Sequence, residues 1–293
     1  MAPFVVPDVL VLAGGGVVGE AWMTGVLAGI EDAAGVDLRH VESYVGTSAG
    51  AIVAARLVAG QELRRPPRRP RTAAPSEPDA DRGLLRTAVR WGWAATAPLA
   101  PVASALAAPG GALVRSALLA RAPHEGRSLS RLHAELERSG ARFDGRLRVC
   151  CVDRASGRRV VFGAPGAPPA TVADAVTASC AIPWVFAPVR IGDREYVDGG
   201  VWSVTNLDAA PARRDTEVLC LDPTAALRSP IRQAFRVAIA VERQLLRGRG
   251  ARVRHVAPDD AAAEAMGEDF MASAPAVPAL AAGYRQGRAL ARG

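Results

Sequence analysis

Ser48 is the residue of this sequence with the clearest chemical potential. It lies at the centre of a G-x-S-x-G pattern from Gly46 to Gly50, between an apolar run at residues 41–45 and a helical pattern at residues 49–59. A serine on such a tight strand-to-helix turn exposes its hydroxyl as a nucleophile, and small flanking residues avoid clashes with the neighbouring strand and helix. The following helix turns its N-terminus towards a developing alkoxide. The alternative is a serine that only caps this helix.

Asp198 is the candidate base for this serine. It follows a short strand-like run and precedes Gly199 and Gly200 in the segment REYVDGGVWSVTN. Two glycines after an aspartate allow the carboxylate to turn sharply out of a strand towards a neighbouring loop, where it can accept a proton. The same three residues could instead form an ordinary hairpin turn.

A glycine loop near the N-terminus offers backbone amides. Gly14, Gly15 and Gly16 follow an apolar run and, together with Gly19, have the spacing G-x-G-x-x-G. Such a loop binds the pyrophosphate of a dinucleotide when an acidic residue ends the next strand. In this chain Ser48 takes that second position, so we expect the loop amides to form an oxyanion hole for an acyl oxygen.

Histidine is the usual base for a serine nucleophile, and the chain has four. His40 precedes the strand that leads to the serine and so lies at its far end, while His124 and His133 lie in or just after an insertion. Only His255 could follow a carboxylate in the chain order of a Ser-Asp-His triad. Two mechanisms stay open on the residues alone, a serine-aspartate dyad and a triad completed by His255.

Alternating strand and helix patterns position these groups. Strands expected at 9–13 and 41–45 alternate with helices at 20–34 and 49–59, which predicts an α/β fold with a mainly parallel sheet. Further elements are expected as strands at 147–153, 159–162, 195–197, 218–221 and 252–256, an extended piece at 183–189, a helix at 172–179, and mainly helix from residue 225 onward.

Composition sets the broad class. The 293 residues are 49% hydrophobic and can bury a large core, and we expect one domain over residues 1–293. The net charge of +7 comes from arginine alone, since the chain has no lysine. Arginine pairs with phosphate on nucleic acids, lipids and soluble molecules alike, so the charge does not identify a partner, and no nucleic acid is expected.

The cysteines and the N-terminal sequence indicate the cellular compartment of the protein. Cys150, Cys151, Cys180 and Cys220 lack metal-site spacing and the density of a disulfide scaffold, so we expect reduced core residues, with no metal and no organic cofactor. The N-terminal apolar run lacks a basic flank and leads directly into glycines, which favours a first strand over a signal peptide and a cytoplasmic protein as the default.

Residues 61–125 form an expected insertion. Its first part is rich in arginine and proline, and its second part is an uncharged, alanine-rich stretch that prolines and glycines interrupt. These breakers argue against a membrane span and favour a cap or lid beside the site. Trp91 and Trp93, flanked by arginines, predict peripheral membrane contact through about residues 84–120.

The glycine loop, the serine turn and the Asp-Gly-Gly turn resemble the patatin-like phospholipase family in order and spacing. Residues 178–201 also look like the run before that family's catalytic aspartate, and the likeness covers residues 9–59 and about 147–210. The resemblance implies a three-layer α/β/α sandwich and a serine acyl hydrolase for phospholipid or neutral lipid esters. It also implies a Ser48–Asp198 dyad without histidine.

One position departs from the pattern of the family. Its glycine loop usually carries Arg or Lys where this chain has Val18, which leaves the headgroup preference open and permits a neutral ester substrate. Two other interpretations stay open: a catalytically weak lipid-binding or regulatory module, and a nucleotide-binding protein that uses the same glycine loop.

Overall fold

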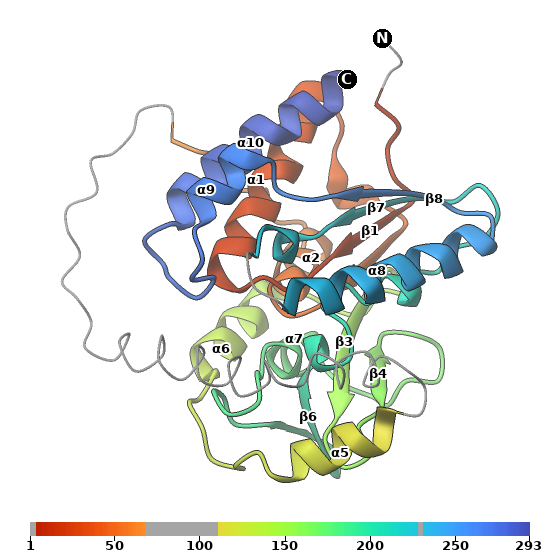
Figure 1. Ribbon diagram of the computed structural model, residues 1–293, viewed down its shortest axis with the longest axis vertical. Coiled ribbons are helices and arrows are strands. Elements are labelled where there is room, and N and C mark those ends of the chain that lie inside the picture. Colours follow the sequence, from red (N-terminus) through yellow and green to blue (C-terminus); the bar gives the residue numbers. More distant parts are fainter. Residues whose placement is uncertain (1–3, 68–110, 228–230) are drawn as a thin grey trace.

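The computed structural model describes residues 4–67, 111–227 and 231–293 (Figure 1). Its strands are β1 (Val9–Leu12), β2 (Ser43–Gly46), β3 (Leu147–Asp153), β4 (Arg159–Phe162), β5 (Val189–Ile191), β6 (Arg194–Asp198), β7 (Glu217–Leu221) and β8 (Arg252–Val256). Its α-helices are α1 (Gly16–Ala34), α2 (Ala49–Val58), α5 (Ala112–Ala120), α6 (Ser130–Ser139), α7 (Val172–Ser179), α8 (Ile231–Gly248), α9 (Asp260–Met266) and α10 (Ala276–Arg292). Short 3₁₀ turns are η1 (Leu38–His40), η4 (Gly199–Val201), η5 (Leu207–Ala209) and η6 (Pro223–Ala226).

The described strands form one sheet in the order β5-β6-β3-β2-β1-β7-β8, with β4 paired to β3. The pairings around β1, from β3 through β2 and β1 to β7 and β8, are parallel. Antiparallel pairing is confined to β4, β5 and β6. The carboxyl ends of β1, β2, β7 and β8 therefore meet at one edge, where α/β proteins place their sites.

Helices cover both faces of this sheet, which makes the fold a three-layer α/β/α sandwich as predicted. Leu10 and Leu12 point to the layer that contains α1, α2, α7, α9 and α10. Val9 and Val11 point to the opposite face, where they join Leu246 of α8 in a second core cluster. In Figure 1, β1 and β7 lie between α1 and α8. Side chains that alternate into two buried layers explain the continuous apolar run of β1.

Most predicted elements agree with the structure. The strands at 147–153, 159–162 and 252–256 and the helix at 172–179 have the predicted bounds. Helix α1 begins earlier than predicted, at Gly16, because the glycine loop leads directly into its first turn.

The extended piece predicted at 183–189 is correct only in its second half. Backbone N–H groups of Val185 and Phe186 both donate to the Ile182 carbonyl, and Trp184 has a positive φ of 63°, so residues 183–185 form a turn. Phe186 then forms an isolated parallel bridge with Arg127, and strand β5 begins at Val189.

Helices α1 and α10 cross at very close range. A Cβ at Gly25 or Gly29 of α1 would overlap a backbone carbonyl oxygen of α10, and a Cβ at Gly283 or Gly287 would overlap a carbonyl oxygen of α1. The glycine pairs are spaced four residues apart, so they lie on one face of each helix. This contact holds the C-terminal helix against the helix that follows the glycine loop.

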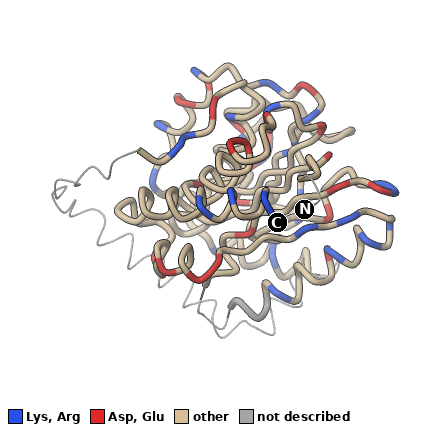
Figure 2. Tube along the Cα trace, turned by 90° about the horizontal axis from the view of Figure 1, so that it is seen from above, with Lys and Arg blue, Asp and Glu red and all other residues tan. Residues whose placement is uncertain are grey.

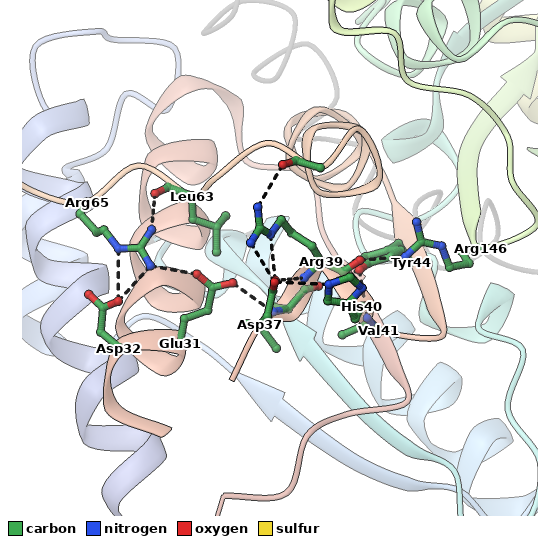
Figure 3. Close-up of polar contacts among 12 residues, drawn as sticks. Glu31, Asp32, Asp37, Arg39, His40, Val41, Tyr44, Leu63, Arg65 and Arg146 are labelled. Atoms are coloured by element: carbon green, nitrogen blue, oxygen red, sulfur yellow. Dashed lines mark hydrogen bonds and ion pairs between the residues drawn. The ribbon is translucent and has the colours of Figure 1, made fainter. Parts of the chain in front are cut away.

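A polar network fixes the end of α1 and the start of β2, at the sheet edge opposite Ser48 (Figure 3). Glu31 accepts the N–H of Leu38 at 3.0 Å, and the buried Tyr44 hydroxyl donates to the Leu38 carbonyl at 2.7 Å. Arg39 forms side-chain hydrogen bonds to Asp37, which lower the pKa of that carboxyl to about 2. Burial raises the pKa of Tyr44 to about 12.

The charge and cysteine predictions can be compared with the structure. In Figure 2, arginines alternate with acidic residues along much of the trace of the described residues. All four cysteines are buried and unpaired, which confirms them as reduced core residues.

None of the described helices combines the length and apolar composition needed to cross a membrane. Within the same residues, no group of three or more potential ligands could hold a metal ion.

The predicted insertion at 61–125 lies mostly outside the described residues. This includes Trp91, Trp93 and most of the 84–120 segment. The described end of the insertion forms helix α5, whose Leu119 packs with Val152 and Val197. The lid and the membrane contact stay predictions.

Candidate active site

Ser48 lies at the carboxyl end of β2, on the turn into α2. Its backbone angles are φ 51° and ψ −120°, a conformation that L residues rarely adopt and that costs free energy. Gly46 and Gly50 explain the spacing of the pattern. A Cβ at Gly46 would overlap Ala51, and a Cβ at Gly50 would overlap the Leu12 carbonyl group of β1. The turn brings α2 so close to the sheet that both positions must be glycine.

Ser179, at the end of α7, supports the serine turn. Its hydroxyl accepts the backbone N–H of Ser48 at 2.9 Å and donates to the Cys150 carbonyl at 2.7 Å. The side chain is fully buried and so bridges the serine turn to β3. No local sequence pattern points to Ser179, because its partners are far away in the chain.

Asp198 ends β6 and points its carboxylate into the same region. Its carboxylate accepts the Gly200 N–H at 2.7 Å, and its own N–H donates to the Ala181 carbonyl at 3.0 Å. A Cβ at Gly199 would overlap the Cys150 carbonyl oxygen of β3. The first glycine therefore permits close packing on β3, and the amide of the second fixes the carboxylate.

The Asp198 carboxyl has a shifted pKa. Burial raises it from 3.8 to about 6, while hydrogen bonds from the Gly200 N–H and the Ser48 side chain offset part of the increase. Only 5% of the residue is exposed. The carboxylate is thus a stronger base than an ordinary aspartate, and the Ser48 side chain is close enough to influence its pKa.

The glycine loop lies directly beside Ser48. A Cβ at Gly14 would be 3.6 Å from the Ser48 Cβ. The Gly14 amide, however, donates to the Val204 carbonyl at 2.8 Å. Among the described residues, no group accepts the amides of Gly15, the N-cap residue of α1, and of Gly16, the first residue of this helix. These two N–H groups can therefore donate to an oxygen placed next to Ser48.

Asn206 connects the serine turn to the aspartate loop. It is fully buried, with a positive φ of 47°, and its side-chain amide donates to the Thr47 hydroxyl at 3.1 Å and the Gly199 carbonyl at 3.3 Å. Glu242 of α8 fixes the same segment by accepting the Thr205 hydroxyl at 2.6 Å. Burial raises the pKa of Glu242. Neither Asn206 nor Glu242 was predicted as part of the site. The position of Asn206 shortly after the Asp-Gly-Gly turn could have indicated its role.

The structure does not bring a histidine to Ser48. His255 lies on β8, and its Nε2 atom is 3.2 Å from Asp222. Strands β1 and β7 separate β8 from β2. His124 is next to Glu195, His133 is next to Asp174, and each of these three histidines thus has an acidic partner of its own. The geometry favours the dyad over the triad.

Val18 faces the interior of the protein and not the site. It is fully buried in the core cluster around α1, and its N–H donates to the Phe270 carbonyl at 3.1 Å. A charged side chain in this place would lack room and solvent, so the apolar residue fits the local packing.

The fold is an α/β sandwich in which a strained serine turn, an aspartate loop and a glycine loop lie close together. The family model for patatin-like phospholipase matches residues 10–211, and the chain belongs to this family. Membership associates the chain with lipid hydrolysis in general. No protein of curated function matches the chain.

Two solved structures resemble the chain along most of its length. VipD from Legionella pneumophila is 15% identical with a TM-score of 0.46, and the match covers 99% of this chain and 67% of VipD. The type III effector protein ExoU is 18% identical with a TM-score of 0.38, and the match covers 98% of this chain and 53% of ExoU.

Proposed function

We propose that this protein is a serine acyl hydrolase that cleaves carboxylic esters of lipids through a Ser48–Asp198 dyad. The observation that supports this most is the strained turn that carries Ser48 together with the buried Asp198, whose pKa burial raises to about 6 and the Ser48 side chain lowers in part. At neutral pH such a carboxylate is ionised and more basic than ordinary aspartate, as a general base requires. Family membership supports the lipid ester as the substrate.

In the proposed mechanism, Asp198 takes the hydroxyl proton of Ser48 while the serine oxygen bonds to the ester carbonyl carbon. The amides of Gly15 and Gly16 stabilise the negative oxygen of the tetrahedral intermediate. The intermediate collapses, the ester C–O bond breaks, and the leaving alcohol takes the proton from Asp198. A water molecule, deprotonated by the same carboxylate, then attacks the acyl carbon of the acyl-enzyme. The bond between this carbon and the Ser48 oxygen breaks, Ser48 takes the proton back from Asp198, and the fatty acid is released.

The dipole of α2 assists the base. Its first amides lie next to the Ser48 oxygen, and the N–H of Ala49 has no acceptor among the described residues. A helix N-terminus stabilises a developing negative charge at this position. This contribution matters because a carboxylate is a weaker base for an alcohol than a histidine is.

Labelling with a fluorophosphonate tests the nucleophile. We expect one covalent adduct, located on Ser48 by mass spectrometry and absent from Ser48→Ala. Asp198→Asn should lose far more ester hydrolysis than His255→Ala, because His255 pairs with Asp222 and not with Ser48. A panel of phosphatidylcholine, phosphatidylglycerol and triacylglycerol then defines the substrate.

Two results would contradict the proposal. Well-folded protein that neither reacts with the label nor hydrolyses a short-chain ester would favour a lipid-binding or regulatory module. A rise of the melting temperature with NAD or ATP, which binding to the native state would cause, would favour a nucleotide-binding protein.

A further inference from the structure

Helix α8 exposes a row of apolar side chains. Val237, Val241 and Leu245 are spaced four residues apart, so they lie on one face of the helix. Each of the three is at least 50% exposed, and in Figure 1 no described helix or strand lies over the outer side of α8. Single exposed apolar residues are ordinary, but a continuous apolar row on one helix indicates a contact surface.

The packing of α8 on the sheet does not account for this row. Ile239, Glu242 and Leu246 form the inner side of the helix and are at most 7% exposed. The outer side takes no part in this packing, and the outer side of a surface helix normally carries polar residues. The apolar row therefore has a purpose other than the stability of the fold.

A row of arginines lies beside the apolar row. Arg236, Arg243 and Arg247 are spaced seven and four residues apart, which places them on one side of α8. Arg236 and Arg247 are exposed, Arg243 is half-buried, and none of the three forms an ion pair with a described residue. Glu242 is the one acidic residue in the sequence of this helix, and it faces inward. The outer side of α8 is therefore positive as well as apolar.

This charge decides between the partners that an apolar row could bind. The α8 helix of a second copy of the chain offers no outward acidic side chain, and antiparallel packing of two such helices would bring two rows of like charge together. An anionic lipid surface accepts both rows at once. Apolar side chains enter the boundary between headgroups and acyl chains, while arginines contact the lipid phosphates.

Helix α8 also packs against the segment that supports the candidate site. Glu242 accepts the Thr205 hydroxyl at 2.6 Å and the Leu207 N–H at 2.9 Å. Asn206, between these two residues, donates to the Thr47 hydroxyl of the serine turn. A lipid surface on the outer side of α8 is therefore separated from this segment by the width of one helix, about 10 Å.

We propose that the outer side of α8 binds anionic lipid bilayers. Val237, Val241 and Leu245 enter the interface, and Arg236 and Arg247 contact the lipid phosphates. The helix lies in the plane of the bilayer surface, as a helix with an apolar outer row and an arginine row does. The inference goes beyond the proposed hydrolysis and does not depend on it.

Sedimentation with vesicles tests this surface without catalysis. Ser48→Ala protein should sediment with vesicles of phosphatidylglycerol mixed equally with phosphatidylcholine, and should stay in solution with phosphatidylcholine alone. Adding Val241→Asp should lower the affinity for the anionic vesicles about tenfold or more. Val277→Asp is the matched control, because it changes a 60% exposed valine of α10, on the other face of the sheet, and should have no effect.

Removal of two arginines tests the electrostatic part of the binding. Arg236→Gln combined with Arg247→Gln should weaken binding about twentyfold, at roughly fivefold for each charge. Arg131→Gln combined with Arg138→Gln removes the same charge from exposed positions of α6, whose Leu136 packs on the other face of the sheet. An equal loss in both double variants would mean that only the net charge matters, and would overturn the proposal.

Other partners give different results. A wild-type dimer in analytical ultracentrifugation that Val241→Asp dissociates would assign the row to a second copy of the chain and overturn the proposal. Absence of binding to anionic vesicles, or equal binding to phosphatidylcholine vesicles, would overturn it as well. Melting temperatures close to that of the wild type show that the variants are folded, and Leu245→Gln replaces Val241→Asp if that variant does not fold.

Discussion

Replacement of Asp198 by asparagine should abolish activity and stabilise the protein at neutral pH. The carboxyl titrates near 3.8 in an unfolded chain and at about 6 in the folded protein, because burial disfavours its charged form. Each pH unit of this difference is worth about 1.4 kcal/mol, so ionised Asp198 costs the native state about 3 kcal/mol. Asparagine has nearly the same shape and does not ionise, so the variant avoids this cost.

The sign of the pH dependence follows from the raised pKa. The folded protein holds this proton more tightly than the unfolded chain does, so wild-type stability falls relative to Asp198→Asn as the pH rises from about 4 through about 6. Below pH 4 the two proteins should be about equally stable. Above pH 7 the variant should melt roughly 6 °C higher, given about 2 °C per kcal/mol for a chain of this size.

Two measurements check this reasoning. Melting curves at pH 4 and pH 7.5 give the stability of Asp198→Asn and of Asp193→Asn, an exposed control that should differ from wild type by less than about 0.5 kcal/mol. The kcat/KM of the wild type for a short-chain ester should rise with pH to a plateau, with its midpoint at about 6, and the variant should lose about two to four orders of magnitude. A variant without extra stability at pH 7.5, or with the same advantage at both pH values, would refute the buried, ionised base.

Three further changes test the supports of the site and the fold. Ser48→Gly removes the nucleophile and relieves the strained backbone, so labelling should disappear while urea denaturation shows a gain of about 1 kcal/mol. Ser179→Ala leaves the buried Ser48 N–H without its acceptor, which should cost about 1–3 kcal/mol in the same assay and lower kcat more than it changes KM. Gly287→Ala would overlap the Val26 carbonyl of α1 and should cost about 1–3 kcal/mol, whereas Gly248→Ala, in open space, should be neutral or stabilising. An equal effect of these two glycine changes would contradict the close helix crossing.

Local sequence patterns were sufficient to predict most strands and the helices around them. They also gave the order of the glycine loop, the serine turn and the Asp-Gly-Gly turn along the chain. Strands β3, β4 and β8 and helix α7 have the predicted bounds, because each combines apolar periodicity with clear turn residues at its ends. The segment at 183–189 was predicted only in part. Its apolar residues suggested one continuous extended piece, but the carbonyl of Ile182 accepts two N–H groups and bends residues 183–185 into a turn before the bridge at Phe186.

The supports of the site could not be predicted, because they depend on contacts between distant segments. Ser179 acts on Ser48 from 131 residues away, and Asn206, which also contacts Gly199, is 159 residues away from its partner Thr47. Tertiary contacts also decide which N–H groups of the glycine loop are already hydrogen-bonded, since the Gly14 N–H donates to the Val204 carbonyl. Only the packed structure shows which loop amides are left for an oxyanion.

His255 shows how the sheet order separates two histidine roles that chain order alone leaves open. Its position after a carboxylate permitted a catalytic triad, but β8 lies three strands from β2 and directly beside β7. His255 is therefore paired with Asp222, which directly follows β7, and strands β1 and β7 separate this pair from the serine turn after β2. Chain order alone permits a triad, but the order of the strands in the sheet leaves Asp198 as the acidic group next to Ser48.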